Sequence, residues 1–232
     1  MRKSGISWEI YHPSVHTAHT KTDSYLKASG SGLYSTWCET FEQRIKQIEQ
    51  GISEKKAAYD ETREKANDAA VLFVNEFKDP DNVAETLKAQ VLAAYDFGIL
   101  DGAMQENTRY KEKAEAMKKA SSDFLFSRQE FETGIQNNTK ARAKAEQKAM
   151  SFSNECTALF NRARVTKSKT HRRTIMKKLA IVGGKYVEAS AYTGLFEGCK
   201  QENQNYVNVL DKLIRAAGGA KSEAVLLGEH NA

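Results

Sequence analysis

The sequence predicts an all-α protein, an elongated antiparallel three-helix bundle of coiled-coil-like helices with a flexible N-terminal arm. Proline is absent after Pro80, so the strongest helix breaker is missing from roughly the last two-thirds of the chain. Apolar residues recur at intervals of three, four and seven, which is the spacing of a helix face packed in a coiled coil. No segment shows the alternating pattern of a half-buried strand.

Residues 1–32 are predicted to form the flexible arm. They mix His, Ser, Thr, Gly and Pro13 without a sustained period, and Gly30-Ser31-Gly32 closes the segment like a hinge. The arm contains no apolar run that would serve as the core of a signal peptide, so we expect a cytoplasmic protein. Pro13 breaks any local helix among its three histidines, and no acid or cysteine completes a metal site with them, so we interpret them as arm residues: His12, His16 and His19.

Residues 33–217 are predicted to form one long-helix coiled-coil domain, and residues 218–232 a C-terminal tail. The first helix is expected from Leu33 to about Lys78. One apolar seam on it advances by sevens through Ile45, Ile52, Tyr59, Ala66 and Phe73. A turn with helix-capping residues then follows at Asp79-Pro80-Asp81-Asn82.

The turn between the second and third helices has two candidate positions. We prefer Gly134–Thr139, the denser cluster of helix breakers, over Ser151–Asn154. The third helix is then expected to run without interruption to about Ala217, with a bend at Gly183-Gly184. In the second helix, Gly98 and Gly102 indicate a bend, a close helix crossing or no special role.

The charge is distributed unevenly along the chain. Residues 136–185 hold thirteen Lys and Arg against two Glu, a net charge of +11. The whole chain is +5, so the remaining residues sum to −6. Residues 79–135 alone hold eleven acids against seven bases. Because the basic segment has few acids for ion pairs along the helix, we expect its repulsion to be offset by an anionic partner.

On a continuous third helix most of these cations share an arc of about 120°, separate from the apolar arc of Phe152, Cys156 and Leu159. We therefore predict a cationic stripe that binds an anionic surface. The candidate binding residues are Lys140, Lys144, Lys148, Arg162, Arg164, Lys167, Lys169, Arg172, Arg173, Lys177 and Lys178. Phosphorylation of Ser168, Thr170 or Thr174 would weaken this binding by adding negative charge.

The sequence carries no pattern typical of an enzyme. Gly183-Gly184-Lys185 lacks the spacing of a phosphate-binding loop, and Cys156 with His171 matches no nucleophile motif. We expect no catalytic residues, no metal, no cofactor and no small-molecule substrate. The three cysteines are widely spaced and odd in number, which favours reduced thiols: Cys38, Cys156 and Cys199.

Three long helices, a dense basic segment and the lack of a catalytic motif together resemble a BAR-type membrane-binding domain. The resemblance covers Leu33–Ala217 and rests on architecture, so no family residue is carried over. It implies an antiparallel homodimer that lays a basic curved face on anionic lipid. Leu33, Tyr34 and Trp37 would then be candidate anchors at the membrane interface, but we favour Trp37 as the first core residue of the first helix.

The leading hypothesis is a non-enzymatic scaffold, a homodimer in the cytoplasm that associates peripherally with anionic membranes. No apolar stretch approaches the roughly 20 residues of a membrane-spanning helix. Two alternatives remain open. One is a nucleic-acid-binding or virion-associated structural coil, and the other is an assembly subunit whose basic segment pairs with the acidic segment 79–135 of another copy.

Overall fold

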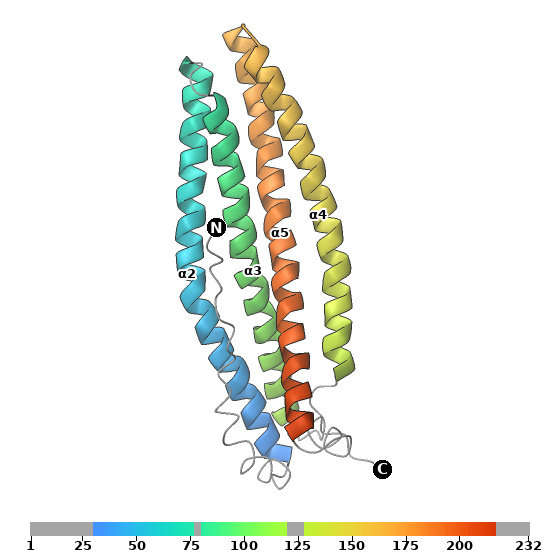
Figure 1. Ribbon diagram of the computed structural model, residues 1–232. Coiled ribbons are helices and arrows are strands. Elements are labelled where there is room, and N and C mark those ends of the chain that lie inside the picture. Colours follow the sequence, from blue (N-terminus) through green and yellow to red (C-terminus); the bar gives the residue numbers. More distant parts are fainter. Residues whose placement is uncertain (1–29, 77–79, 120–127, 217–232) are drawn as a thin grey trace. The chain divides into compact units, whose positions relative to one another are not determined.

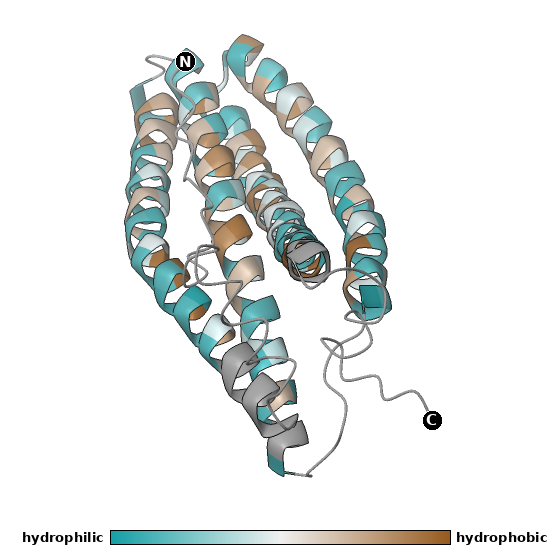
Figure 2. Cartoon of the chain, turned by 60° about the horizontal axis from the view of Figure 1, so that its bottom comes forward, coloured by the Kyte–Doolittle hydropathy of each residue, from teal (hydrophilic) through white to brown (hydrophobic). Residues whose placement is uncertain are grey.

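The computed structural model describes residues 30–76, 80–119 and 128–216, and this part of the chain is helical apart from one short turn (Figure 1). The four helices are α2 (Gly30–Glu76), α3 (Pro80–Lys119), α4 (Arg128–Val165) and α5 (Lys169–Ala216). No strand occurs in the described residues, which confirms the all-α prediction for them. Each helix carries hydrophilic and hydrophobic residues along its length (Figure 2), as amphipathic helices do.

Three details of the predicted helix pattern are wrong. Gly30–Gly32, the expected hinge, are the first residues of α2. Both candidate turns, Gly134–Thr139 and Ser151–Asn154, lie inside α4. The predicted third helix is two helices, because the chain turns at residues 166–168, so the described residues form four helices where three were expected. The arm up to residue 29 and the tail from residue 217 lie outside the described residues.

Local hydrogen bonds explain why α4 continues through its polar residues. The Thr139 hydroxyl donates to the Ile135 carbonyl at 2.7 Å, and the Thr157 hydroxyl donates to the Ser153 carbonyl at 2.9 Å. Both side chains therefore bond back onto the preceding turn instead of ending the helix. Ala145 and Ala149 between them are buried, so tertiary packing stabilises the segment against its weak propensity.

The chain divides into two compact units, each built from segments of several helices. Of the described residues, unit 1 contains 30–47, 107–119, 128–132 and 204–216, and unit 2 contains 48–76, 80–106 and 133–203. In unit 1, one aromatic side chain from each helix joins a common cluster with ring centroids 5.1–5.8 Å apart. Its members are Phe41, Tyr110, Phe131 and Tyr206, all 3 % exposed or less. The Tyr206 hydroxyl in this cluster hydrogen-bonds to the buried Asn107 side chain.

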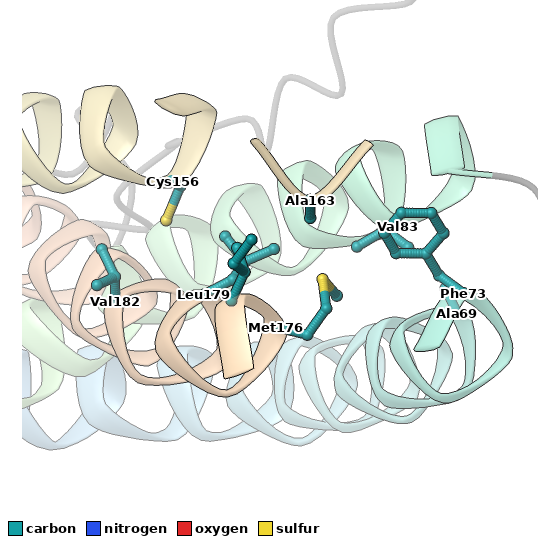
Figure 3. Packing of buried hydrophobic residues seen from close by; sticks show 9 residues of the cluster. Ala69, Phe73, Val83, Cys156, Ala163, Met176, Leu179 and Val182 are labelled. Atoms are coloured by element: carbon teal, nitrogen blue, oxygen red, sulfur yellow. The ribbon is translucent and has the colours of Figure 1, made fainter. Parts of the chain in front are cut away.

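The main apolar core of unit 2 lies near the ends where α2 joins α3 and α4 joins α5 (Figure 3). Phe73 of α2 is fully buried there, and Met176 and Leu179 of α5 are 6 % and 5 % exposed. Cys156 points from α4 toward α5 in the same cluster. The predicted seam of the first helix does face inward, since Phe73 is buried and Ile52, Tyr59 and Ala66 are partly buried.

Two helices of unit 2 cross at glycines. A Cβ atom at Gly98 would lie 2.2 Å from the Ala191 carbonyl oxygen, and one at Gly102 would lie 1.9 Å from the Leu195 oxygen. The glycines of α5 are placed in the same way: a Cβ at Gly194 would lie 2.1 Å from the Tyr95 oxygen and one at Gly198 2.0 Å from the Ile99 oxygen. The two backbones are therefore in direct contact, and α3 and α5 run parallel. Of the three readings of Gly98 and Gly102, the close crossing is confirmed.

A buried polar layer follows this crossing. The Asn203 amide, fully buried on α5, donates to the Glu106 carboxylate at 2.5 Å and to the Cys199 carbonyl at 2.8 Å. The Cys199 thiol donates to the Gly102 carbonyl at 3.2 Å. Because these buried polar groups are satisfied, the layer fixes the register of α3 against α5.

Candidate anion-binding surface

The dense basic segment lies at the turn between α4 and α5. We call the exposed cations around this turn the basic tip. They are Arg162, Arg164, Lys167, Lys169, Arg173, Lys177 and Lys178. The sequence contains no acid from Cys156 to Val187, so this hairpin has no carboxylate of its own to neutralise the tip.

The turn itself is built from three residues with helix-ending chemistry. The Thr166 backbone amide bonds to the Ala163 carbonyl at 3.2 Å, which closes the last turn of α4. The Ser168 hydroxyl then accepts a bond from the His171 amide at 3.3 Å and acts as the N-cap of α5. The turn thus points Lys167 into solvent between two helix ends.

An exposed apolar side chain accompanies the cations at the turn. Val165, the last residue of α4, is 77 % exposed, the highest exposure among the large hydrophobic residues of the described chain. It lies between Arg164 and the turn. The tip therefore presents an exposed apolar group among exposed cations.

Part of the basic tip has internal partners. Arg164 forms an ion pair with Asp81 of α3 at 3.4 Å, with side chains 51 % and 66 % exposed. Arg173 donates to the Asn75 side-chain oxygen at 3.4 Å. The end of α2 at Asn75 and the start of α3 at Asp81 therefore lie beside the α4–α5 turn in unit 2. Such exposed pairs contribute at most about 1 kcal/mol, so they hold these side chains weakly.

Arg172 was predicted to belong to the cationic stripe, and this prediction is wrong. Its side chain is 6 % exposed, and the guanidinium carbon lies 5.9 Å from the centre of the Phe73 ring. Arg172 precedes the buried Ile175, Met176 and Leu179 by three, four and seven positions, so it shares their face. It packs inside unit 2 and is not available to a partner surface.

The prediction that most of the cations share one 120° arc is also wrong. That arc required a continuous helix, and the direction in which side chains face is not carried from α4 to α5 across the turn. Lys140, Lys144 and Lys148 are exposed on α4 as predicted. At 1.5 Å per residue, however, Lys148 lies roughly 24 Å along α4 from Arg164. The structure thus separates the candidate residues into the basic tip, a distant stripe of three lysines and the buried Arg172.

Groups typical of catalysis or metal binding are sparse. In the described ranges, no cluster of three or more His, Cys, Asp or Glu has the geometry to hold a metal ion. Burial raises the pKa of the Cys156 thiol to about 11, so at neutral pH it is protonated and a poor nucleophile. Within those ranges no helix has an apolar stretch long enough to cross a bilayer.

Sequence reasoning located the basic segment but missed two features of the site. The exposure of Val165 follows from the helix ending there, and the Ser168 cap was a signal for that end. The burial of Arg172 could have been predicted from its spacing to the apolar residues of α5, had α5 been treated as a separate helix.

The fold and this surface define an all-α helical protein with a cationic hairpin turn. No family model matches the chain, and no curated protein or solved structure matches it.

Proposed function

We propose that the protein is a non-enzymatic helical module that attaches to anionic membrane surfaces through the basic tip. The observation that carries the proposal is the clustering of seven exposed Lys and Arg around one turn, within a sequence stretch from Cys156 to Val187 that contains no acid. Each basic residue near an anionic membrane contributes about 1 kcal/mol. A few such contacts suffice for reversible peripheral attachment.

Val165 favours a lipid surface over other polyanions. A largely exposed valine at the turn inserts readily among lipid headgroups, where its burial is favourable. Nucleic-acid phosphates offer no comparable apolar environment, and residues 162–178 contain no Phe, Tyr or Trp for base stacking. We therefore place the membrane contact at the end of the hairpin, not along a continuous face of α4 and α5.

The test compares two triple variants with the same change in charge. One reverses the tip, Lys167→Glu, Lys169→Glu and Arg173→Glu, and the other reverses the stripe, Lys140→Glu, Lys144→Glu and Lys148→Glu. Losing three attractive contacts of about 1 kcal/mol each weakens binding by roughly two orders of magnitude. We expect the tip variant to stop co-sedimenting with phosphatidylserine vesicles, and the stripe variant to retain most of its binding.

Controls separate charge from folding and lipid from phosphate. Circular dichroism should be unchanged in both variants, because all six side chains are exposed. Neutral phosphatidylcholine vesicles should not bind the unmodified protein. Equal loss of binding in the two variants would reject the tip as the site, and a gel shift with duplex DNA in the absence of vesicle binding would reject the membrane.

A second candidate function is binding to an acidic protein surface, including another copy of this chain. The ion pair between Arg164 and Asp81 favours it, because the tip already accepts a carboxylate from a neighbouring helix. In that case the unmodified protein would not bind vesicles, and the tip variant would lose self-association or binding to the acidic partner.

A further inference from the structure

A groove runs along the seam between α3 and α4 of unit 2, above α5. Its first part is a cavity of about 350 Å³ lined by α3, α4 and α5. Its second part, of about 500 Å³, shares Ser153 and Tyr186 with the first, so the two are adjacent. On α3 the lining extends from Val83 to Tyr95, which is roughly 18 Å of helix. Each volume falls within the range of ligand pockets.

The two parts differ in chemistry. The first has an apolar floor of Val83, Cys156 and Leu179, each 5 % exposed, and Figure 3 shows these residues grouped together. The second contains Arg142 and Glu146, and Arg142 already pairs with Glu197 at 3.1 Å. An apolar ligand is therefore accommodated in the first part.

Lys88 is the one charged residue that lines the first part of the groove. Its side chain is exposed, and it forms no ion pair with another described residue. An exposed cation in the lining of an apolar cavity matches a ligand with an apolar tail and an anionic head. The Ser153 hydroxyl, also in the lining, adds a hydrogen-bond donor for such a head, whereas the Thr157 hydroxyl already donates to the Ser153 carbonyl.

We propose that this groove binds a single-chain anionic amphiphile, with the acyl tail in the cavity of Val83, Cys156 and Leu179 and the carboxylate at Lys88. No residue of the basic tip lines the groove, and this proposal does not depend on the tip. Its occupant is a fatty-acid-like molecule in solution, whereas the tip binds an extended lipid surface.

Isothermal titration calorimetry with dodecanoate below its micellar concentration tests the proposal. We expect saturable binding of dodecanoate and weaker binding of dodecyltrimethylammonium, which has the same tail and the opposite charge. Lys88→Gln should weaken dodecanoate binding roughly two- to fivefold, as expected for one exposed ion pair. The matched control Lys148→Gln removes one exposed charge from α4 outside the lining and should leave binding unchanged.

Two further variants test occupation of the cavity. Ser153→Phe adds a ring in the part shared by both cavities, and Ala84→Phe adds one at an exposed position of the lining. Either variant should abolish dodecanoate binding while its circular dichroism stays that of the unmodified protein. Ala84→Phe changes an exposed side chain, so it remains informative if Ser153→Phe does not fold.

The outcomes separate this proposal from the membrane proposal. No binding of dodecanoate, equal binding of both amphiphiles, or normal binding by a folded Ala84→Phe variant would each overturn the groove. The tip variant with Lys167, Lys169 and Arg173 changed to Glu should still bind dodecanoate. A loss of vesicle binding by this variant therefore tests the membrane proposal and not the groove proposal.

Discussion

At the residue scale, neighbouring arginines in α5 have opposite environments. Arg172 is buried against Phe73, whereas Arg173 is exposed and holds only a 3.4 Å hydrogen bond to Asn75. The apolar stem and guanidinium of Arg172 pack in the core of unit 2, so the residue contributes to stability through contact as well as charge.

We predict that Arg172→Ala destabilises the protein by roughly 1–3 kcal/mol, because it removes buried packing and a cation–ring contact. The matched variant Arg173→Ala should change stability by less than about 0.5 kcal/mol. Urea unfolding followed by circular dichroism measures both. Similar midpoints for the two variants would contradict the burial of Arg172.

Cys156 gives a prediction on pH. Burial raises the pKa of its thiol to about 11 in the folded chain, from 9.0 for an unperturbed thiol. The folded state therefore holds this proton more tightly than the unfolded state. The resulting stability is present below pH 9 and is lost as the pH rises toward 11.

We accordingly expect the free energy of unfolding to fall between pH 9 and pH 11 by up to roughly 2–3 kcal/mol more in the unmodified protein than in Cys156→Ala. Comparing the two proteins cancels the lysines and tyrosines that titrate in the same range. As an independent check, Cys156 should react slowly with iodoacetamide at pH 7.5 in the native state and quickly in urea. Rapid native alkylation would show that the thiol is exposed.

At the scale of the elements, the contact of α3 with α5 determines how unit 2 packs. Glycines on both helices leave room for the opposing carbonyl groups, and no other residue fits at those distances. The glycine pairs are spaced by four on each helix, Gly98 and Gly102 on one, Gly194 and Gly198 on the other. The same spacing allows close packing wherever two helix backbones meet.

Gly102→Ala should therefore destabilise the protein by about 2 kcal/mol or more, because its Cβ would lie 1.9 Å from a backbone oxygen and the helices must move apart. Gly184→Ala is the control. Its Cβ meets nothing within 4 Å, and replacing a helical glycine with alanine should stabilise by about 0.5–1 kcal/mol. Opposite shifts of the urea midpoint are expected, and shifts of the same sign would argue against the close crossing.

At the scale of the whole molecule, assembly remains a prediction. Val71 and Leu72 of α2 are 56 % and 48 % exposed, an adjacent apolar pair that a second copy would cover. We expect light scattering at micromolar concentration to give twice the chain mass of 25.9 kDa. Val71→Asp with Leu72→Asp should then give a monomer. A monomeric unmodified protein would reject the homodimer and leave the tip and groove experiments unaffected.

The sequence by itself determined that the described chain is helical and which face of α2 turns inward. Both follow from local physics: breakers are few, and an apolar period of 3.5 to 3.6 residues specifies one buried stripe. It also located the excess of positive charge in residues 136–185, because charge is a property of composition.

Only the tertiary structure decided where the helices end and which cations face solvent. Gly134–Thr139 and residues 166–168 both contain residues that weaken helices. Packing around Ala145 and Ala149 kept the first segment helical, whereas at the second segment the chain turns and Ser168 caps the start of α5. Because the chain turns there, the face that α5 buries is independent of the face that α4 buries. Arg172 therefore lies in the core, whereas Arg173 is exposed to solvent. Periodicity within a helix is a local property, but the choice between two weak helix breaks depends on the side chains of neighbouring helices.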